Sequence, residues 1–411
     1  MSSPAMTPVS AFPIPKVPVF DWNYLRPCRA EPVANLSQLP AFAHTTSGRA
    51  ALFAALRQLD LPPGAGVLVP TYHCPTMVAP VLEAGLRPVF YPLGADGQPL
   101  LDAIEGAAGA APGAMIVAHY FGLPRSWSTL ARWCRDRGIV LIEDCAHCYF
   151  GMAGERPVGH WGDFATASIS KFLPVPECGL LGSAHRPLRP LGLRPPGARS
   201  QAKAAWDVID TSVRYGRLAG LSHLLSPLAR LRGSAAPGPA GALSALEDRT
   251  PTDEEIIEGC DMGRVRDRPT FVARLIHRAL PFGRLIAKRR EHYRRYDEAF
   301  ASAHGARPLV SDPPPGAVPY VYPLWIEGSE RADAIYAAAR QERLPIFRWD
   351  RRWPGTPVLP HDNGLHWSRH VLQLLCHQDL RREDIDQVTS RLQSLLKACP
   401  SRGPKVNSIA P

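Results

Sequence analysis

The sequence predicts an α/β fold, in which a large lobe built on a mixed, mainly parallel sheet is followed by a smaller C-terminal α+β lobe. Between residues 41 and 184, short apolar runs alternate with amphipathic helical stretches, the pattern of a parallel sheet covered on both faces. A similar alternation returns between about 305 and 397. A chain of 411 residues is long enough to form two such lobes.

The elements of the large lobe follow from this alternation. Apolar runs predict strands, and the amphipathic stretches between them predict helices. The expected strands are 66–70, 87–91, 114–118 and 138–142, and the expected helices are 50–59, 77–84 and 127–137. Ligands of such sheets gather at the carboxyl ends of the strands, so residues that follow these runs are candidates for a site.

The alternation breaks at a segment rich in proline and arginine. Its leucines recur at helical spacing beside arginines, which fits either a helix packed on its own protein or dimer partner, or a weak membrane-surface contact through 205–232. After it, Thr252 and Glu255 form a capping box that predicts a helix start. The expected later elements are helices 282–300, 331–342 and 382–397 and a strand 320–326.

These patterns divide the chain into six parts. The predicted parts are an N-terminal arm (1–40), a large cofactor-binding domain (41–184), a Pro/Arg-rich helical insert (185–250), connecting helices (251–300), a small C-terminal domain (301–397) and a disordered tail (398–411).

Charge and composition exclude several classes of protein. The net charge is +10, but residues 185–240 hold nine Arg/Lys and two Asp, which is +7 and leaves only +3 elsewhere. This local patch has no zinc-finger or RNA-binding signature, so we expect no nucleic-acid partner. No apolar run reaches the length of about 18–20 residues that a membrane span needs, and the N-terminus lacks the pattern of a signal peptide. Nine irregularly spaced cysteines favour reduced thiols in a cytoplasm.

Lys171 is the first candidate for chemistry. It is the only lysine between Lys16 and Lys203, in a chain with six lysines among 47 basic residues. Because the chain otherwise uses arginine for positive charge, a lysine here indicates an amine that can lose its proton and attack a carbonyl. The alternative is a lysine that merely lies on the solvated surface.

An acidic residue pairs with this lysine in the order that a pyridoxal 5′-phosphate (PLP) site requires. Asp144 follows a predicted buried strand, 27 residues before Lys171. In such a site the lysine bonds to the cofactor aldehyde and a carboxylate keeps the pyridine nitrogen protonated. The alternation favours Asp144 over Glu143 for this role, and a helix cap is the alternative role for Asp144.

Two further segments could bind the phosphate of such a cofactor. Ser47-Gly48 stands at the start of a predicted helix, where free amides and the helix dipole attract anions. Ser168 and Ser170 could reach the same phosphate from another side. Cys145-Ala146-His147-Cys148 could be read as a zinc motif, but it lacks a second cysteine pair, so we expect no metal.

With these motifs in place, the chain resembles the DegT/DnrJ/EryC1/StrS family of fold-type I sugar aminotransferases. The matching segments are 47–52, 69–72, 119–122, 142–147, 162–164 and 168–171, with looser likeness at 289–296 and 372–380. The resemblance implies that Lys171 carries PLP and that Asp144 binds the pyridine nitrogen. It also implies the remaining cofactor contacts, which are Ser47, Gly48, Arg49, His147 and Ser168.

The chain departs from the family pattern at four places, of which the first two are a shortened approach to the lysine at Ile169-Ser170-Lys171 and the 185–250 insert, which has no counterpart in the family. The other two bear on the cofactor contacts. The aromatic residue that stacks on the cofactor ring falls nearest Cys74, so the expected substitutes are Tyr72 or His73, although His73, like His119, could equally be a core or rim histidine. The family segment that often reaches a neighbouring subunit's phosphate appears as Gly259-Cys260-Asp261, where the carboxylate would repel a phosphate.

The resemblance implies a PLP-dependent aminotransferase that moves an amino group from an amino acid, with glutamate as the expected donor, to a nucleotide-linked keto-sugar. It also implies a homodimer. Two alternatives remain open: a PLP-fold regulator or scaffold without catalysis, and a PLP-dependent sugar dehydratase. Related dehydratases carry histidine at the position of Lys171, so the lysine favours transamination.

Overall fold

A computed structural model describes residues 13–26, 31–107, 112–221, 252–310 and 312–399. Its large lobe contains a seven-stranded sheet in the order β1-β9-β8-β5-β4-β2-β3. Neighbours from β3 to β8 run parallel, whereas β9 is antiparallel to both β8 and β1. The predicted mixed, mainly parallel sheet is confirmed. The strands are β1 (Ala41–Thr45), β2 (Gly66–Pro70), β3 (Arg87–Tyr91), β4 (Ala114–Ala118), β5 (Val140–Asp144), β8 (Phe164–Ser168) and β9 (Gly179–Ser183).

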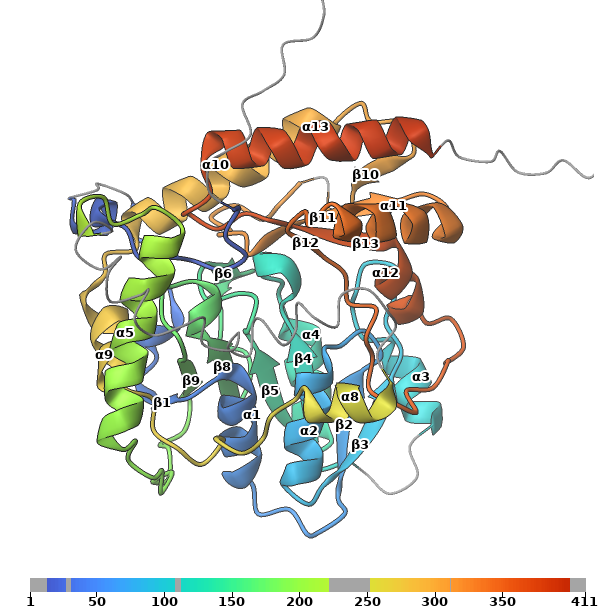
Figure 1. Ribbon diagram of the computed structural model, residues 1–411. Helices are drawn as coiled ribbons and strands as arrows, with labels where there is room; N and C mark the ends of the chain where they lie inside the picture. The colour runs from blue at the N-terminus through green and yellow to red at the C-terminus, as the bar shows by residue number, and fades with distance from the viewer. Residues whose placement is uncertain (1–12, 27–30, 108–111, 222–251, 311, 400–411) are drawn as a thin grey trace, which may run out of the picture.

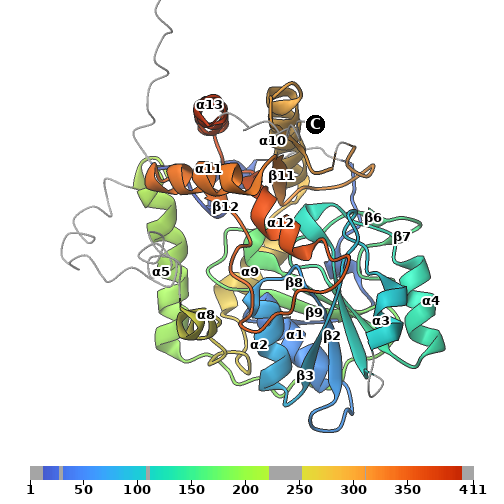
Figure 2. The ribbon, with the colours of Figure 1, turned by 90° about the vertical axis from the view of Figure 1, so that its right-hand side faces the viewer.

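Helices cover both faces of this sheet, as Figure 2 shows, with α1 and α2 on one side and α3 and α4 on the other. Strands β2 and β4 are buried along their whole length, because apolar residues occupy both faces. The helices are α1 (Gly48–Arg57), α2 (Pro75–Glu83), α3 (Leu101–Ala107) and α4 (Ser128–Asp136).

Three of the predicted strands lie where the sequence placed them, and the fourth is shifted. The expected strand 138–142 begins only at Val140, because Gly138 has a φ of 66° in the turn that follows α4. Strands β1, β8 and β9 were absent from the prediction.

The small lobe is an antiparallel sheet with helices packed against it, which confirms the predicted α+β lobe. Its strand order is β10-β11-β13-β12. This lobe lies above the large sheet in Figure 1, with α13 at the top. Its elements are α10 (Gly283–Phe300), β10 (Ala306–Pro308), β11 (Val321–Ile326), α11 (Ser329–Gln341), β12 (Ile346–Phe347), α12 (Gly364–His370), β13 (Val371–Leu375) and α13 (Arg382–Ala398).

In the chain between the two lobes, α5 (Ala198–Arg214) packs on α9 (Phe271–Ala279), and both lie beside the β1 edge of the large sheet in Figure 1. The predicted capping box at Thr252 starts α8 (Asp253–Glu258), with Thr252 Oγ1 accepting from the Glu255 amide. Most of the leucine-rich stretch and of the predicted tail lies outside the described residues. None of the helices in the described ranges is both long and apolar enough to cross a bilayer.

The described part of the N-terminal arm is docked on the molecule. Val19 and Tyr24 are each 1% exposed, and both donate to the Asp379 carboxylate, over 3.2 Å from the amide and 2.9 Å from the hydroxyl. The remaining short elements are η1 (Trp22–Leu25), η2 (Leu36–Gln38), η3 (Tyr120–Gly122), η4 (Ile169–Lys171) and the hairpin of β6 (Met152–Ala153) and β7 (Arg156–Pro157).

Candidate active site

Lys171 lies in the single turn η4, directly after β8 at the carboxyl end of the parallel strands. Its Nζ atom is 5.3 Å from the centre of the Tyr320 ring. Burial lowers the pKa of this amine, and the charges of Cys74 and Asp144 oppose that shift. A lysine held in this way spends more time as the neutral, nucleophilic amine than a surface lysine does.

Asp144 closes the neighbouring strand β5 and interacts electrostatically with the Lys171 amine. Its Oδ1 accepts from the Ala146 amide at 2.8 Å. Burial raises the pKa of this carboxyl, while the Ala146 amide and the Lys171 charge lower it. The structure therefore brings the two residues paired by the sequence argument to adjacent strand ends.

Glu143, the fallback for Asp144, lies on the opposite face of the strand and is fully buried. Its Oε1 accepts from the amides of Trp161 and Gly162, both at 2.7 Å, and its Oε2 accepts from the Gly159 amide and from His119 Nε2. Burial opposes ionisation, but His119 and the amides outweigh it and hold the pKa of Glu143 below its usual range. This carboxylate therefore fixes the 159–162 turn, and His119 is a core histidine.

His147 carries a polar atom without a partner in the described structure. The residue is 4% exposed, and its Nδ1 has no hydrogen bond among the described residues. Its ring centre is 4.4 Å from that of Tyr320 and 4.8 Å from that of Trp349. Burial and the charge of Lys171 lower the pKa of His147, so the imidazole is neutral at pH 7. A buried ring nitrogen left in this state is suited to bind a ligand.

The two candidate phosphate segments meet at the start of α1. Ser47 caps this helix, and its Oγ accepts from the Ala50 amide at 3.2 Å. A Cβ on Gly48 would come within 3.2 Å of the Ser168 Cβ, so glycine permits the close approach of α1 to β8. In the described part of the chain no acceptor pairs with the amides of Gly48 and Arg49, which remain for an anion.

The side chain of Arg49 points to a different partner. Its Nε donates to the Asp261 carbonyl at 2.9 Å, and its Nη2 lies 3.3 Å from the Asp261 carboxylate. Asp261, whose carboxylate was expected to repel a phosphate, thus pairs with Arg49 beside the start of α1. Arg49 would contribute through its backbone amide.

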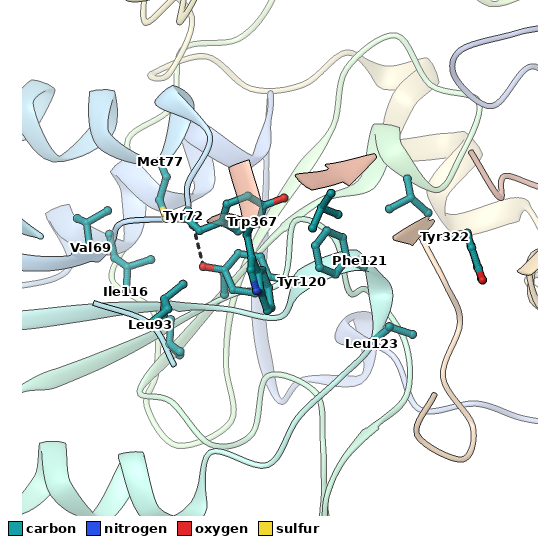
Figure 3. Close-up of a cluster of buried hydrophobic side chains, with 14 of the residues drawn as sticks. Val69, Tyr72, Met77, Leu93, Ile116, Tyr120, Phe121, Leu123, Tyr322 and Trp367 are labelled. Atoms are coloured by element: carbon teal, nitrogen blue, oxygen red, sulfur yellow. Dashed lines mark hydrogen bonds between the residues drawn. The ribbon is translucent and has the colours of Figure 1, made fainter. Parts of the chain in front are cut away.

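Tyr72 and His73, the expected ring-stacking residues, have other partners. Figure 3 shows Tyr72 inside the core beside Tyr120 and Trp367, and its hydroxyl accepts from Gln373 Nε2 at 3.3 Å. His73 donates from Nδ1 to the Pro70 carbonyl at 2.8 Å.

The other nitrogen of His73, Nε2, accepts from the Trp353 amide at 3.0 Å. One neutral tautomer of His73 satisfies both of its nitrogens. The structure does not bring this ring to Lys171.

Residues that the sequence reasoning missed complete the site. Tyr320 comes from the start of the small lobe and Trp349 from the loop after β12. Trp349 lies between His147 and Tyr72, with ring centres 4.8 Å and 5.0 Å away. Both rings are about 150 residues or more from Lys171 in the chain, and no local pattern marks them.

The cysteine pair of the alternative zinc motif is fully buried. Cys145 donates to the Glu143 carbonyl at 3.7 Å and Cys148 to the Phe150 carbonyl at 3.6 Å. In the described part of the chain, His119, Glu143 and Cys145 form a group spaced within 4.8 Å, but the Glu143 oxygens are already occupied by N–H donors. The amine of Lys171, the carboxylate of Asp144 and the unpartnered imidazole nitrogen of His147 are groups that fit PLP better than a metal ion.

Comparison with known proteins identifies relatives for this arrangement. The chain is 33% identical over 141 residues to dTDP-4-dehydro-2,3,6-trideoxy-D-glucose 4-aminotransferase of Saccharopolyspora spinosa, which covers 34% of the chain and 37% of the relative. It is 33% identical over 161 residues to UDP-N-acetyl-3-dehydro-alpha-D-glucosamine 3-aminotransferase of Acidithiobacillus ferrooxidans. This match covers 39% of the chain and 42% of the relative. The matches thus span about two fifths of these relatives.

Solved structures resemble nearly the whole chain. The aminotransferase TlmJ of Streptoalloteichus hindustanus has a TM-score of 0.58 at 19% identity, covering 87% of this chain and 86% of its own. Spr1654 of Streptococcus pneumoniae, solved in its PLP form, has a TM-score of 0.56 at 17% identity, covering 89% of each chain. The fold is therefore that of the PLP-type aminotransferases.

A family model matches part of the chain. Residues 32–181, which are less than half of the chain, match the model of the DegT/DnrJ/EryC1/StrS aminotransferase family. Over these residues the match agrees with the resemblance seen in the sequence. The matched region contains the proposed cradle, Asp144 and Lys171.

Proposed function

We propose that this protein is a PLP-dependent aminotransferase that moves an amino group from an amino acid, with glutamate as the donor, to a nucleotide-linked keto-sugar. The observation that carries the proposal is the buried Lys171 amine, which follows β8 and interacts electrostatically with Asp144 at the end of the paired strand β5. The relatives named above, aminotransferases of dTDP- and UDP-linked sugars, support the substrate class.

The residues of the site would hold PLP at four points. Lys171 Nζ would bond to its aldehyde, Asp144 would bind the pyridine nitrogen, and His147 Nδ1 would bind a polar ring substituent. The α1 cradle of Ser47, Gly48 and Arg49, with Ser168, would bind its phosphate. When bound, the protonated ring serves as an electron sink for the substrate α-carbon.

The chain itself supplies proton transfer and shielding from water. As a neutral amine, Lys171 Nζ would take up the proton that leaves the substrate α-carbon and would give it back later in the reaction. The carboxylate of Asp144 interacts electrostatically with the Lys171 amine, so it would stabilise that amine in its protonated form. The rings of Tyr320 and Trp349, tilted against that of His147, would close the site on the side of the small lobe and exclude water.

Spectroscopy tests this proposal. Purified protein mixed with PLP should show the visible absorbance band of a lysine-bound cofactor, and Lys171→Ala should abolish it. Lys203→Ala is a matched control, because Lys203 is exposed and pairs with Asp207. Glutamate should then shift the spectrum to the amine form, and a panel of nucleotide keto-sugars should gain an amine by mass. Absence of any bound cofactor would contradict the proposal.

A PLP-fold regulator or scaffold is the second candidate. Cys74, in the position where the family places a stacking aromatic, and the Arg49–Asp261 pair beside the cradle favour it. The glutamate half-reaction separates the two, since a scaffold would bind the cofactor but leave its spectrum unchanged. A dehydratase is the third candidate, and the lysine at position 171 is evidence against it.

Assembly and location belong to the same proposal. We place the enzyme in the cytoplasm as a homodimer. Free thiols at all eight cysteines within the described ranges support a reducing compartment. Analytical ultracentrifugation tests the assembly.

A further inference from the structure

Arg289 on α10 is buried completely, yet its guanidinium has no carboxylate among its hydrogen-bond partners in the described structure. Its Nη2 donates to the Lys171 carbonyl at 2.8 Å, its Nη1 to the Pro319 carbonyl at 3.1 Å, and its Nε to Gln378 Oε1 at 3.0 Å. The guanidinium carbon also lies 4.7 Å from the centre of the Phe172 ring.

Such a placement is costly for stability alone. Burial lowers the pKa of Arg289 to about 10, which shows how unfavourable this environment is for a cation. An apolar residue of similar volume would fill the same space without the desolvation of a charge. The benefit that arginine adds is geometric, because its planar fork fixes several acceptors in one plane.

These acceptors lie on both sides of the site. One is the main chain of Lys171 itself, in the large lobe. Another is the main chain just before Tyr320, whose ring lies 5.3 Å from Lys171 Nζ. The third, Gln378, follows β13 in the small lobe and also donates to the Phe172 carbonyl at 2.8 Å. A single guanidinium therefore sets the position of the lysine relative to the aromatic wall.

We infer that Arg289 is the positioning residue for Lys171: it holds the lysine main chain and the 319–320 main chain in the register that places the amine at the Tyr320 ring. This inference rests on the proposed function, in which Lys171 bonds to PLP. In the described structure the partners of Arg289 are all protein groups, so in this proposal it would act through the lysine.

The neighbouring residue Arg290 provides a matched control. Its Nε donates to the Ala317 carbonyl at 2.9 Å and its Nη2 to the Gly316 carbonyl at 2.7 Å. It therefore anchors the same loop from the same helix but makes no bond to residue 171. If loop anchoring were all that mattered, changes at the two arginines would have similar effects.

The experiment compares Arg289→Lys, Arg289→Ala and Arg290→Ala with the unmodified protein by titration with PLP and by the pH dependence of the bound cofactor's absorbance. Arg289→Ala loses the hydrogen bonds of a charged guanidinium, so its affinity for PLP should fall about tenfold or more. The pH midpoint of the bound cofactor's absorbance should shift as well. Arg290→Ala should stay within about twofold. Guanidinium ion added at low concentration should restore the PLP affinity and the absorbance pH midpoint of Arg289→Ala, and should leave those of Arg290→Ala unchanged.

The outcomes are distinguishable. If Arg289→Ala does not fold, Arg289→Lys decides, because it keeps the charge and loses the fork. A folded Arg289 variant with unchanged affinity and pH midpoint, or with losses equal to those of Arg290→Ala and no rescue, overturns the inference. If the unmodified protein takes up no PLP, the proposed function itself fails, and the inference fails with it.

Discussion

Replacing Glu143 with glutamine should destabilise the fold far more than replacing its neighbour Asp144 with asparagine. The Glu143 carboxylate accepts four N–H groups, two at each oxygen. In Glu143→Gln one oxygen becomes an NH2 group, so two of the four bonds are lost and two buried donors face another donor. At about 1–3 kcal/mol for each unpaired group, the expected loss is about 2–6 kcal/mol, a large share of a typical stability of about 5–15 kcal/mol.

Asp144→Asn is the control for this prediction. In the described structure the Asp144 side chain accepts one hydrogen bond, from the Ala146 amide. A carboxamide oxygen can still accept it, so the free energy of unfolding should change by less than about 1 kcal/mol. Urea unfolding at pH 7 measures both variants. A free energy of unfolding for Glu143→Gln within about 0.5 kcal/mol of the unmodified protein would refute the reasoning.

Three further predictions concern the cofactor site. His147→Phe keeps a ring but removes Nδ1, so equilibrium titration should show PLP affinity reduced by about 5–30-fold, while His147→Gln should retain it; equal losses would exclude a role for the nitrogen. Asp261→Asn removes a negative charge beside the cradle and should tighten PLP binding by about 2–5-fold at low salt, with the gain shrinking as salt rises; a gain that ignores salt would point to another cause. Because burial lowers the pKa of Lys171, PLP uptake by apoprotein should reach its plateau below pH 10.5. Cys74→Ser removes an electrostatic interaction that raises the pKa of Lys171, so PLP uptake by this variant should reach its plateau at lower pH. Stopped-flow absorbance measures the uptake, and a plateau at higher pH would contradict the prediction.

The pairing of Asp144 with Lys171 could be predicted from the sequence because it depends on local order alone. Asp144 stands at the carboxyl end of a predicted apolar run, where ligands of parallel sheets gather, and Lys171 was marked by the scarcity of lysine in the sequence. The strand before Lys171, β8, was not predicted. The choice of Asp144 over Glu143 followed from the two-residue period of a strand. The cradle was accessible for the same reason, since a capped helix start is marked by adjacent residues.

Other parts of the site depend on contacts that no local pattern records. Tyr320 and Arg289 reach Lys171 through the packing of the small lobe on the large one. Tyr72 and His73 were expected at the cofactor because they lie next to Cys74, the position where the family places its stacking aromatic, but their directions are set by distant partners, including Gln373 and the Trp353 amide. Strands β1, β8 and β9 were missed because they are rich in Ala, Gly and Ser, and tertiary burial overrides their weak strand preference.

The central claim is that Lys171 carries PLP. Borohydride reduction of the PLP-loaded protein, followed by proteolysis and mass spectrometry, would fix the cofactor to the lysine that holds it. The account predicts a pyridoxyl label on Lys171 and none on the exposed Lys203. A label confined to another lysine, or no label at all, would contradict it.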